Sequence, residues 1–322
     1  MSEERYILVV AHARRAATVD AAERVIRALL DAGASPVLAR DDREELGEVL
    51  PAAANLPRLG IEVPVDGVEI AVVLGGDGTI LRAAELVRGA AVPILGINLG
   101  HVGFLAESER DDLDEAVARV ISREYRVEER LTVSVRVKNG RGEVVYETWA
   151  LNEATVEKAS RERMLEVVIE IDGRPLSSFG CDGVVVSTPT GSTAYNFSAG
   201  GPVIWPSVEA LAVVPLSAHA LFAKPLVVGP EAAVAVEVLA RTDGVGILWA
   251  DGRRSHELPP GARVVVRRSP EPVRLARLHA PAFTDRLVRK FHLPVDGWRG
   301  PDELSTGTHP IIGGARDESD DA

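Results

Sequence analysis

Strand-like and helix-like patterns alternate along the first part of the chain. Short apolar runs, which are typical of buried strands, are followed by segments in which apolar residues recur at helical spacing. This alternation predicts a parallel sheet with helices on both faces. Residues 40–69 follow neither pattern and predict a short helix and a loop. The predicted strands are 6–11, 36–39, 70–74 and 93–98, and the predicted helices are 22–30, 80–88 and 113–122.

The pattern changes near residue 126. Residues 131–138 alternate strictly between apolar and polar side chains, as a half-buried strand does, and Asn139-Gly140 follows as a hairpin-type turn. Asp172-Gly173 is a second signal of this kind. Many short strands with turn signals predict a β-rich, sandwich-like domain. The other strand-like runs are 144–151, 165–171, 183–187, 233–239, 245–250, 263–268 and 273–278.

The fold class expected from these patterns is therefore α/β plus all-β. An α/β domain is predicted over residues 1–125 and a β-rich domain over residues 126–280. A last helical segment, 281–293, is expected to pack back on the first domain. The acidic residues near the end of the chain predict a solvated, disordered tail over residues 301–322.

A glycine loop, Gly75-Gly76-Asp77-Gly78-Thr79, follows directly after the predicted strand 70–74. The free N–H groups and the dipole at the start of the next helix suit a phosphate, and glycine lets the backbone approach a ligand closely. A carboxylate beside a phosphate is unfavourable because both groups are negatively charged. Its presence is best explained by a metal ion that bridges the two groups or by a role in proton abstraction. An ordinary turn remains an alternative. Neither a Walker-type Gly-Lys-Ser/Thr sequence nor a G-x-G-x-x-G fingerprint after a strand is present.

A second loop, Gly100-His101-Val102-Gly103-Phe104, follows the predicted strand 94–98. Since the carboxyl ends of parallel strands line one edge of a sheet, this loop and the glycine loop should face the same site. His101 could also be only a packing residue.

Two polar segments of the β-rich part are candidates for binding a ligand. Residues 187–201 concentrate hydroxyl groups and small residues after a strand, and Asn152-Glu153 offers an amide and a carboxylate that can grip sugar hydroxyls. Taken alone, each segment could equally be a polar loop or turn. The seven histidines and the lone cysteine show no metal-ligand spacing, and no G-x-S-x-G elbow occurs.

The composition narrows the function classes. The chain has 322 residues and a net charge of −12, which argues against a nucleic-acid-binding or membrane-surface protein. No apolar run reaches the ~18 residues of a membrane span, and the first residues do not resemble a signal peptide. The one cysteine, Cys181, cannot form an internal disulfide, which favours a cytoplasmic protein.

Together, these motifs resemble the NAD kinase family. The glycine loop, Asn152-Glu153, Asp182-Gly183 and the run Ser187-Thr188-Pro189-Thr190-Gly191-Ser192-Thr193-Ala194-Tyr195 occur in the order and spacing of that family, over about residues 5–293. The segment from Pro281 to Phe291 resembles the actinobacterial branch. The glycine loop is shared with lipid kinases and, in variant form, with phosphofructokinases, whereas the serine- and threonine-rich run with Asn-Glu is specific.

The resemblance implies a Rossmann-like, phosphofructokinase-like domain joined to a β-sandwich-like domain that holds NAD. It implies transfer of the γ-phosphoryl group of ATP or polyphosphate to the 2′-hydroxyl of the adenosine ribose of NAD, giving NADP. It further implies a divalent metal, usually Mg²⁺, and a homodimer or homotetramer in which a neighbouring subunit touches the NAD site.

The resemblance also implies site residues. It makes Asp77 the catalytic base and Gly78 a nucleotide contact, with Arg82 and Arg163 at less uniform positions. Arg253 stands where many relatives have Gln. The residues implied to hold NAD are Phe104, Asn152, Glu153, Asp182, Thr193, Ala194, Tyr195, Asn196, Phe197 and Ser198.

Two alternatives stay open at this level. A lipid or sphingoid-base kinase shares the glycine loop, but it needs an apolar acceptor pocket and often a basic membrane-facing surface. A non-enzymatic NAD sensor could keep the same fold, although the intact Asp77 argues against it.

Overall fold

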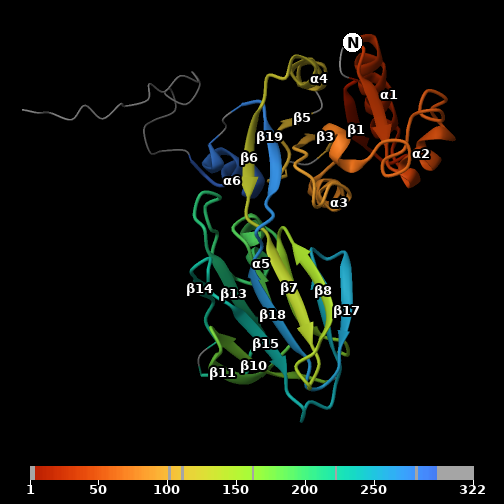
Figure 1. Cartoon of the computed structure of the whole chain (residues 1–322). Helices are drawn as coiled ribbons and strands as arrows, with labels where there is room; N and C mark the ends of the chain where they lie inside the picture. Colours follow the sequence, from red (N-terminus) through yellow and green to blue (C-terminus); the bar gives the residue numbers. More distant parts are fainter. Residues whose placement is uncertain are drawn as a thin grey trace, which may run out of the picture.

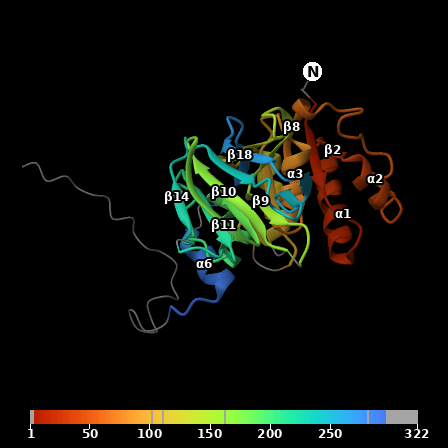
Figure 2. The same cartoon turned by 90° about the horizontal axis from the view of Figure 1, so that it is seen from below.

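The computed structural model describes residues 4–100, 103–109, 112–161, 163–221, 223–279 and 282–295. They form two domains, a helix-covered sheet and a β-rich domain next to it (Figure 1). Helices α1 and α2 lie on the side of the molecule away from β14, as the view from below also shows (Figure 2). Among the helices described, none combines the length and the apolar character needed to span a membrane.

The first domain contains a seven-stranded sheet whose amino-terminal strands are parallel. The strand order is β2-β1-β3-β4-β19-β6, with β5 beside β4. The first five strands are β1 (Tyr6–Val10), β2 (Ser35–Leu38), β3 (Val68–Leu74), β4 (Ile94–Asn98) and β5 (Ser108–Glu109), and the helices are α1 (Ala16–Asp31), α2 (Arg40–Gly47), α3 (Asp77–Leu86) and α4 (Leu113–Ser122).

Successive strand residues point to opposite faces of this sheet and enter two separate cores. Ile7 and Val9 of β1 pack in one core with α1 and α4, whereas Leu8 and Val10 pack in the other core with α3. Both faces of the sheet are therefore covered by helices, as the alternating pattern predicts. The near-continuous apolar runs of β1 and β3 follow from burial on both sides.

The strand pairing differs from the predicted domain boundaries at both ends of the β-rich segment. Strands β6 (Arg126–Arg130) and β19 (Val273–Arg277) lie in the first sheet, where β19 pairs parallel to β4 and antiparallel to β6. Residues 126–280 therefore do not form one separate domain. The local pattern of a strand reports its burial but not its partner, and these partners lie far away in the sequence.

The second domain is a sandwich of two six-stranded antiparallel sheets, which confirms the sandwich-like prediction. One sheet has the order β11-β10-β15-β18-β7-β8 and the other β14-β13-β12-β9-β16-β17, and one apolar core fills the space between them. The bounds are β7 (Val133–Lys138), β8 (Val144–Ala150), β9 (Glu153–Lys158), β10 (Leu165–Ile171), β11 (Arg174–Cys181), β12 (Gly183–Ser187), β13 (Leu211–Leu216), β14 (Leu226–Val228), β15 (Val234–Val238), β16 (Gly246–Ala250), β17 (Arg254–Leu258) and β18 (Arg263–Arg268).

Two short helices complete the described part of the chain. Helix α5 (Tyr195–Ser198) follows β12, and α6 (Phe283–Phe291) follows β19. Helix α6 contacts both domains, because the Phe291 ring lies 5.7 Å from Phe104 and stacks 4.2 Å from Phe197. The predicted tail, 301–322, lies outside the described residues.

Candidate active site

The glycine loop connects the carboxyl end of β3 to the first residue of α3, Asp77. Gly76 precedes the helix as its N-cap residue. A side chain at Gly75 would place its Cβ 2.5 Å from Oγ1 of Thr79, so the turn needs glycine there. Gly76 and Gly78, on either side of the first residue of α3, are exposed, so a ligand can approach the start of this helix.

The carboxylate of Asp77 is held by the second loop. The backbone N–H of Phe104 donates to Oδ2 of Asp77 at 3.0 Å, and the N–H of Leu105 donates to Oδ1 at 3.1 Å. A Cβ at Gly103 would lie 2.3 Å from Oδ1, so only glycine leaves room for this contact. The two loops therefore meet at Asp77, while His101 lies outside the described residues.

A cavity of about 630 Å³ opens beside the glycine loop. Gly76, Gly78 and Thr79 form part of its wall. The cationic side chains of Arg14, Arg15, Arg82 and Arg253 also line it, with His12, Asp41, Asp42 and Glu45. Free N–H groups at a helix start together with guanidinium groups suit a polyphosphate chain.

Arg82 is placed by an ion pair within this cavity. Its Nη1 lies 2.5 Å from Oδ1 of the buried Asp42. Burial raises the pKa of Asp42 to about 6, and the nearby Arg82 opposes that rise. Arg82 therefore lines the cavity as one member of a charge pair.

On the second domain, a buried carboxylate fixes the backbone of the Asn152-Glu153 segment. The N–H groups of Leu151 and Asn152 donate to Asp251 at 2.9 and 2.7 Å, and the N–H of Glu153 donates at 3.4 Å. A Cβ at Gly191 would lie 2.1 Å from the carbonyl oxygen of Asn152, so the polar run packs directly on this segment.

Glu153 is a buried carboxyl group whose Oε2 has no hydrogen-bond partner among the described residues. Burial raises its pKa to about 8, repulsion from Asp251 adds to the rise, and the backbone N–H of Tyr195 opposes it. At neutral pH this side chain is mostly protonated, so it can both donate and accept a hydrogen bond. Such a group can bind a hydroxyl of a ligand.

The polar run folds into a 3₁₀ turn, Thr190–Thr193, followed by α5. Asn196 is buried and its amide donates to the carbonyl groups of Ser192 and Pro202, so it supports the loop from inside. Tyr195 and Phe197, in contrast, are 39% and 41% exposed, so the Tyr195 ring and the face of Phe197 that is not stacked on Phe291 are open to a ligand.

The domains are joined next to the site by Glu85 of α3. Its carboxylate lies 3.1 Å from Nε of Arg253 and 3.0 Å from Nε of Arg254. Arg254 also pairs with Asp251 at 2.8 Å. The helix that begins at Asp77 is thus connected through Arg254 to the carboxylate that holds Asn152 and Glu153.

Comparison with known proteins shows to which family this fold belongs. The model of the ATP-NAD kinase N-terminal domain matches residues 7–125, and that of the ATP-NAD kinase C-terminal domain matches residues 151–278. An NAD kinase of Leifsonia xyli is 67% identical over 302 residues, covering 94% of this chain and 99% of the relative. The chain belongs to the NAD kinase family. It is therefore an enzyme, and the alternative of a non-enzymatic sensor is set aside.

Further relatives and solved structures agree with this assignment. NAD kinase 2 of Streptomyces coelicolor is 59% identical, covering 92% of this chain and 97% of its own length, and the relatives confirm the predicted resemblance to the actinobacterial branch. An Archaeoglobus fulgidus NAD kinase in complex with ATP has a TM-score of 0.66 at 27% identity and covers 89% of this chain and 98% of its own. Yeast NADH kinase complexed with NADH shares the fold, with a TM-score of 0.81 at 21% identity, and covers 94% and 91% of the two chains.

Within one chain of this NAD kinase family member, Asp182 and Arg163 lie away from the other predicted site residues. Asp182 precedes β12, while Ser187 at the other end of β12 pairs with Glu153. Five strand residues span about 17 Å at ~3.4 Å each. Asp182 pairs instead with Lys158, which lowers its pKa, and the exposed Arg163 lies 3.2 Å from Asp243.

Asp251, Arg254 and Glu85 are absent from the site residues that the sequence predicts. Asp251-Gly252 follows a predicted strand directly, and like the glycine loop it places a carboxylate at a turn. This local pattern is a signal from which Asp251 could be predicted as a site residue. Glu85 and Arg254 carry no local signal, since only the folded chain brings them together.

Among the described residues, no group of three or more His, Cys, Asp or Glu side chains is arranged to hold a metal ion. Asp77 nevertheless supplies one carboxylate between Gly76 and Gly78, which line the cavity of the glycine loop. One carboxylate together with phosphate oxygens and water is a common donor set for Mg²⁺. The residues thus fit an ion that arrives with a phosphate substrate.

Proposed function

We propose that this enzyme transfers the γ-phosphoryl group of ATP, or a phosphoryl group of polyphosphate, to the 2′-hydroxyl of the adenosine ribose of NAD, forming NADP. The observation that carries this proposal is the placement of Asp77. Its carboxylate stands at the start of α3, between Gly76 and Gly78 in the wall of the cavity, and two N–H groups of the neighbouring loop fix both of its oxygens.

The donor belongs in the cavity of the glycine loop. The N–H groups at the start of α3 and the helix dipole bind phosphate oxygens, with Gly78 in the wall of the cavity. Arg14, Arg15 and Arg253 add positive charge. Positioning and charge neutralisation account for most of the catalysis of phosphoryl transfer, because its transition state is loose.

The acceptor belongs on the side of Asn152 and Glu153. The amide of Asn152 and the protonated carboxyl group of Glu153 can each donate and accept hydrogen bonds with ribose hydroxyls, and Tyr195 and Phe197 can cover a planar ring. As the acceptor oxygen bonds to phosphorus, the bond from that phosphorus to the bridging oxygen of the donor breaks, the shortened donor leaves with the negative charge, and Asp77 takes the proton of the acceptor hydroxyl on a carboxylate oxygen.

A divalent cation, most simply Mg²⁺, would be held by Asp77 and would neutralise phosphate charge when bound. The enzyme is proposed to act as a homodimer or homotetramer. In such an assembly, Asp182 and Arg163 of a neighbouring subunit could complete the NAD site, which would account for their distance from Glu153 within one chain.

We also propose that the enzyme works in the cytoplasm on these small molecules, without a nucleic-acid or membrane partner. The net charge of −12 supports this. So does the free thiol of Cys181, which is buried and has its pKa raised by that burial to about 12, so that it stays unreactive.

Purified protein incubated with NAD, Mg²⁺ and either ATP or polyphosphate tests the proposal, with NADP as the measured product. Asp77→Asn should lower kcat by about 10²–10⁴-fold because it removes the proton acceptor while preserving the shape. Asp20→Asn, at an exposed position of α1, is the matched control. NADP formation by Asp77→Asn within threefold of the parent would contradict the role of Asp77 as base.

A further inference from the structure

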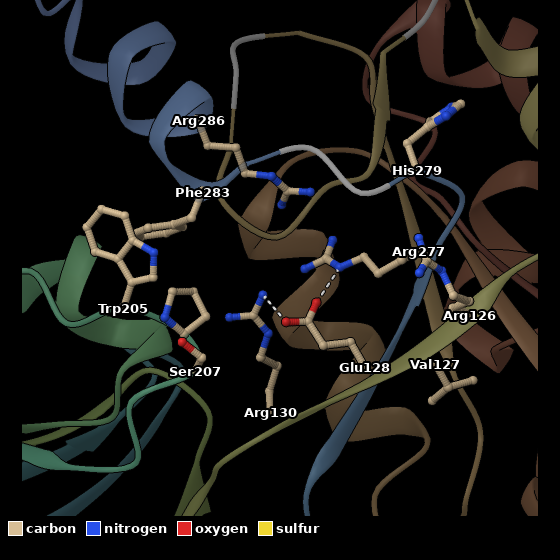
Figure 3. Close-up of a pocket in the computed structure, with 11 residues that line it drawn as sticks. Arg126, Val127, Glu128, Arg130, Trp205, Ser207, Arg277, His279, Phe283 and Arg286 are labelled. Carbon is tan, nitrogen blue, oxygen red and sulfur yellow. Dashed lines mark hydrogen bonds and ion pairs between the residues drawn. The ribbon is translucent and has the colours of Figure 1, made fainter. Parts of the chain in front are cut away.

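A second cavity, of about 460 Å³, lies away from the glycine loop. It is enclosed by β6, β19, α6 and the segment Trp205-Pro206-Ser207 (Figure 3). Figure 3 shows the rings of Trp205 and Phe283 on one side and the guanidinium groups of Arg130, Arg277 and Arg286 turned towards the middle. None of these side chains is assigned a contact with a substrate in the proposed phosphoryl transfer.

Positive charge exceeds negative charge around this cavity. Glu128 is shared between Arg130, at 2.9 Å, and Arg277, at 2.7 Å. Glu107 is shared between Arg277 and Arg286, at 3.0 Å from each. The side chain of Arg126, which also lines the cavity, has no hydrogen-bond or ion-pair partner within the described ranges. Four guanidinium groups therefore face only two carboxylates.

Two of these guanidinium groups are buried and incompletely bonded. Arg130 and Arg277 are each only 8% exposed, and Nε of Arg130 and Nη2 of Arg277 have no hydrogen-bond partner among the described residues. Burial lowers the pKa of Arg130 to about 10 in spite of Glu128, and burial together with repulsion from Arg277 lowers that of Arg286. Buried cations without enough partners are costly, and an anion would offset that cost.

The opposite wall is aromatic and open. The rings of Trp205 and Phe283 meet edge to face, with centroids 4.8 Å apart, and Trp205 remains 45% exposed. An open indole face beside guanidinium groups suits a planar ring that carries negative charge.

We propose that this cavity binds a small molecule in which a phosphate group is attached to a planar ring. Paired N–H donors of arginine match phosphate oxygens, and the volume is that of a small-molecule site. The phosphate would lie among Arg126, Arg130, Arg277 and Arg286, and the ring would lie against Trp205.

The same arginines hold the loop that holds Asp77. Nη1 of Arg286 donates to the carbonyl oxygen of Phe104 at 2.7 Å, and Nη1 of Arg277 donates to that of Leu105 at 3.1 Å. The N–H groups of Phe104 and Leu105 bind the Asp77 carboxylate. A phosphate that competes for these guanidinium groups would shift the loop and alter turnover. This link, unlike the binding site itself, rests on the proposed role of Asp77.

The test is calorimetric titration of the full-length protein with phenyl phosphate, inorganic phosphate and phenol. We expect phenyl phosphate to bind more tightly than either fragment. Arg126→Glu and Trp205→Ala, both at exposed positions, should weaken its binding at least tenfold. Arg141→Glu makes the same charge change at the exposed β7–β8 turn, at the far end of the second domain (Figure 1), and should leave the affinity unchanged.

Two results would refute the proposed binding site. The first is that phenyl phosphate does not bind to the parent protein. The second is that the parent, Arg126→Glu and Trp205→Ala bind it with equal affinity, because the ligand would then lie elsewhere. A second measurement tests the link to Asp77. At saturating NAD and ATP, phenyl phosphate should change kcat of the parent protein but not of Arg126→Glu. Binding without any change in kcat would refute the link alone, and failure to form NADP would refute only the proposed function.

Discussion

Glu153→Gln should make the enzyme more stable in alkaline solution while changing its stability at pH 5 by less than about 1 kcal/mol. Glu153 is buried beside Asp251, and its pKa is raised from 4.5 to about 8. Between these pH values the folded chain keeps a proton that the unfolded chain releases. The free energy of unfolding therefore falls as the pH rises through this range and levels off above it. Glutamine cannot ionise, so the variant escapes this loss.

The size of the effect follows from the same pKa values. Each pH unit corresponds to about 1.4 kcal/mol, so the full difference corresponds to roughly 5 kcal/mol. When Glu153 ionises, its side chain can move towards water, and this reduces the loss of stability. We therefore expect the free energy of unfolding of the variant at pH 9 to exceed that of the parent by about 2–5 kcal/mol. In a chain of this size, that raises the melting temperature by several degrees.

Thermal unfolding of both proteins from pH 5 to pH 9 measures this difference. The control is Glu147→Gln on β8, where the carboxylate is exposed and its ion pair with Arg136 is worth little. Parallel curves of melting temperature against pH for the parent and for Glu153→Gln would show that Glu153 ionises normally, and the argument for a protonated ligand-binding group would fail.

The other predictions concern catalysis. Asn152→Ala should reduce kcat/KM for NAD about tenfold and change the KM for ATP much less, because one hydrogen bond to the acceptor is lost. Steady-state kinetics in which each substrate is varied in turn measure this difference. Equal losses of kcat/KM for both substrates would show that Asn152 supports the fold rather than NAD binding. Gly103→Ala should lower kcat about a hundredfold, because the new Cβ would lie 2.3 Å from Oδ1 of Asp77 and displace it. Gly140→Ala, whose Cβ meets nothing closer than 3.9 Å, is the control, and equal kcat values would refute the steric argument.

The sequence predicts the two loops around Asp77 because each follows a strongly apolar strand, and the rule that strand ends share one edge brings them together. It cannot predict that the N–H groups of Phe104 and Leu105 bind Asp77, because this depends on the path of the loop. Asn196 has a structural part that its motif does not predict. Its amide nitrogen binds the backbone of its own loop, while its Oδ1 has no hydrogen-bond partner among the described residues.

Long-range pairing accounts for most of the remaining differences. Strands β6 and β19 join the first sheet although each is next to a strand of the second domain in the sequence, since pattern alone does not select a partner. The cavity among Arg126, Arg130 and Arg277 depends on this pairing, because β6 and β19 contribute these arginines side by side. No local signal in the sequence could have predicted it.

The same pairing is what would let the two substrates meet if, as we propose, they are held on different domains. The chain crosses between the domains twice, from β6 to β7 and from β18 to β19. Arg88 bonds to both crossings and reaches the first through Thr132, whose Oγ1 lies 3.5 Å from Nη1 of Arg88. Its guanidinium donates to the carbonyl oxygen of Glu271 at 2.8 Å and to Oγ of Ser269 at 2.9 Å, and Thr132 donates to the same carbonyl oxygen at 2.6 Å. Arg88 also lies over the ring of Trp149, 4.1 Å from its centroid. The crossings are therefore fixed close to α3, and this favours selection of one ribose hydroxyl through the set positions of the two domains.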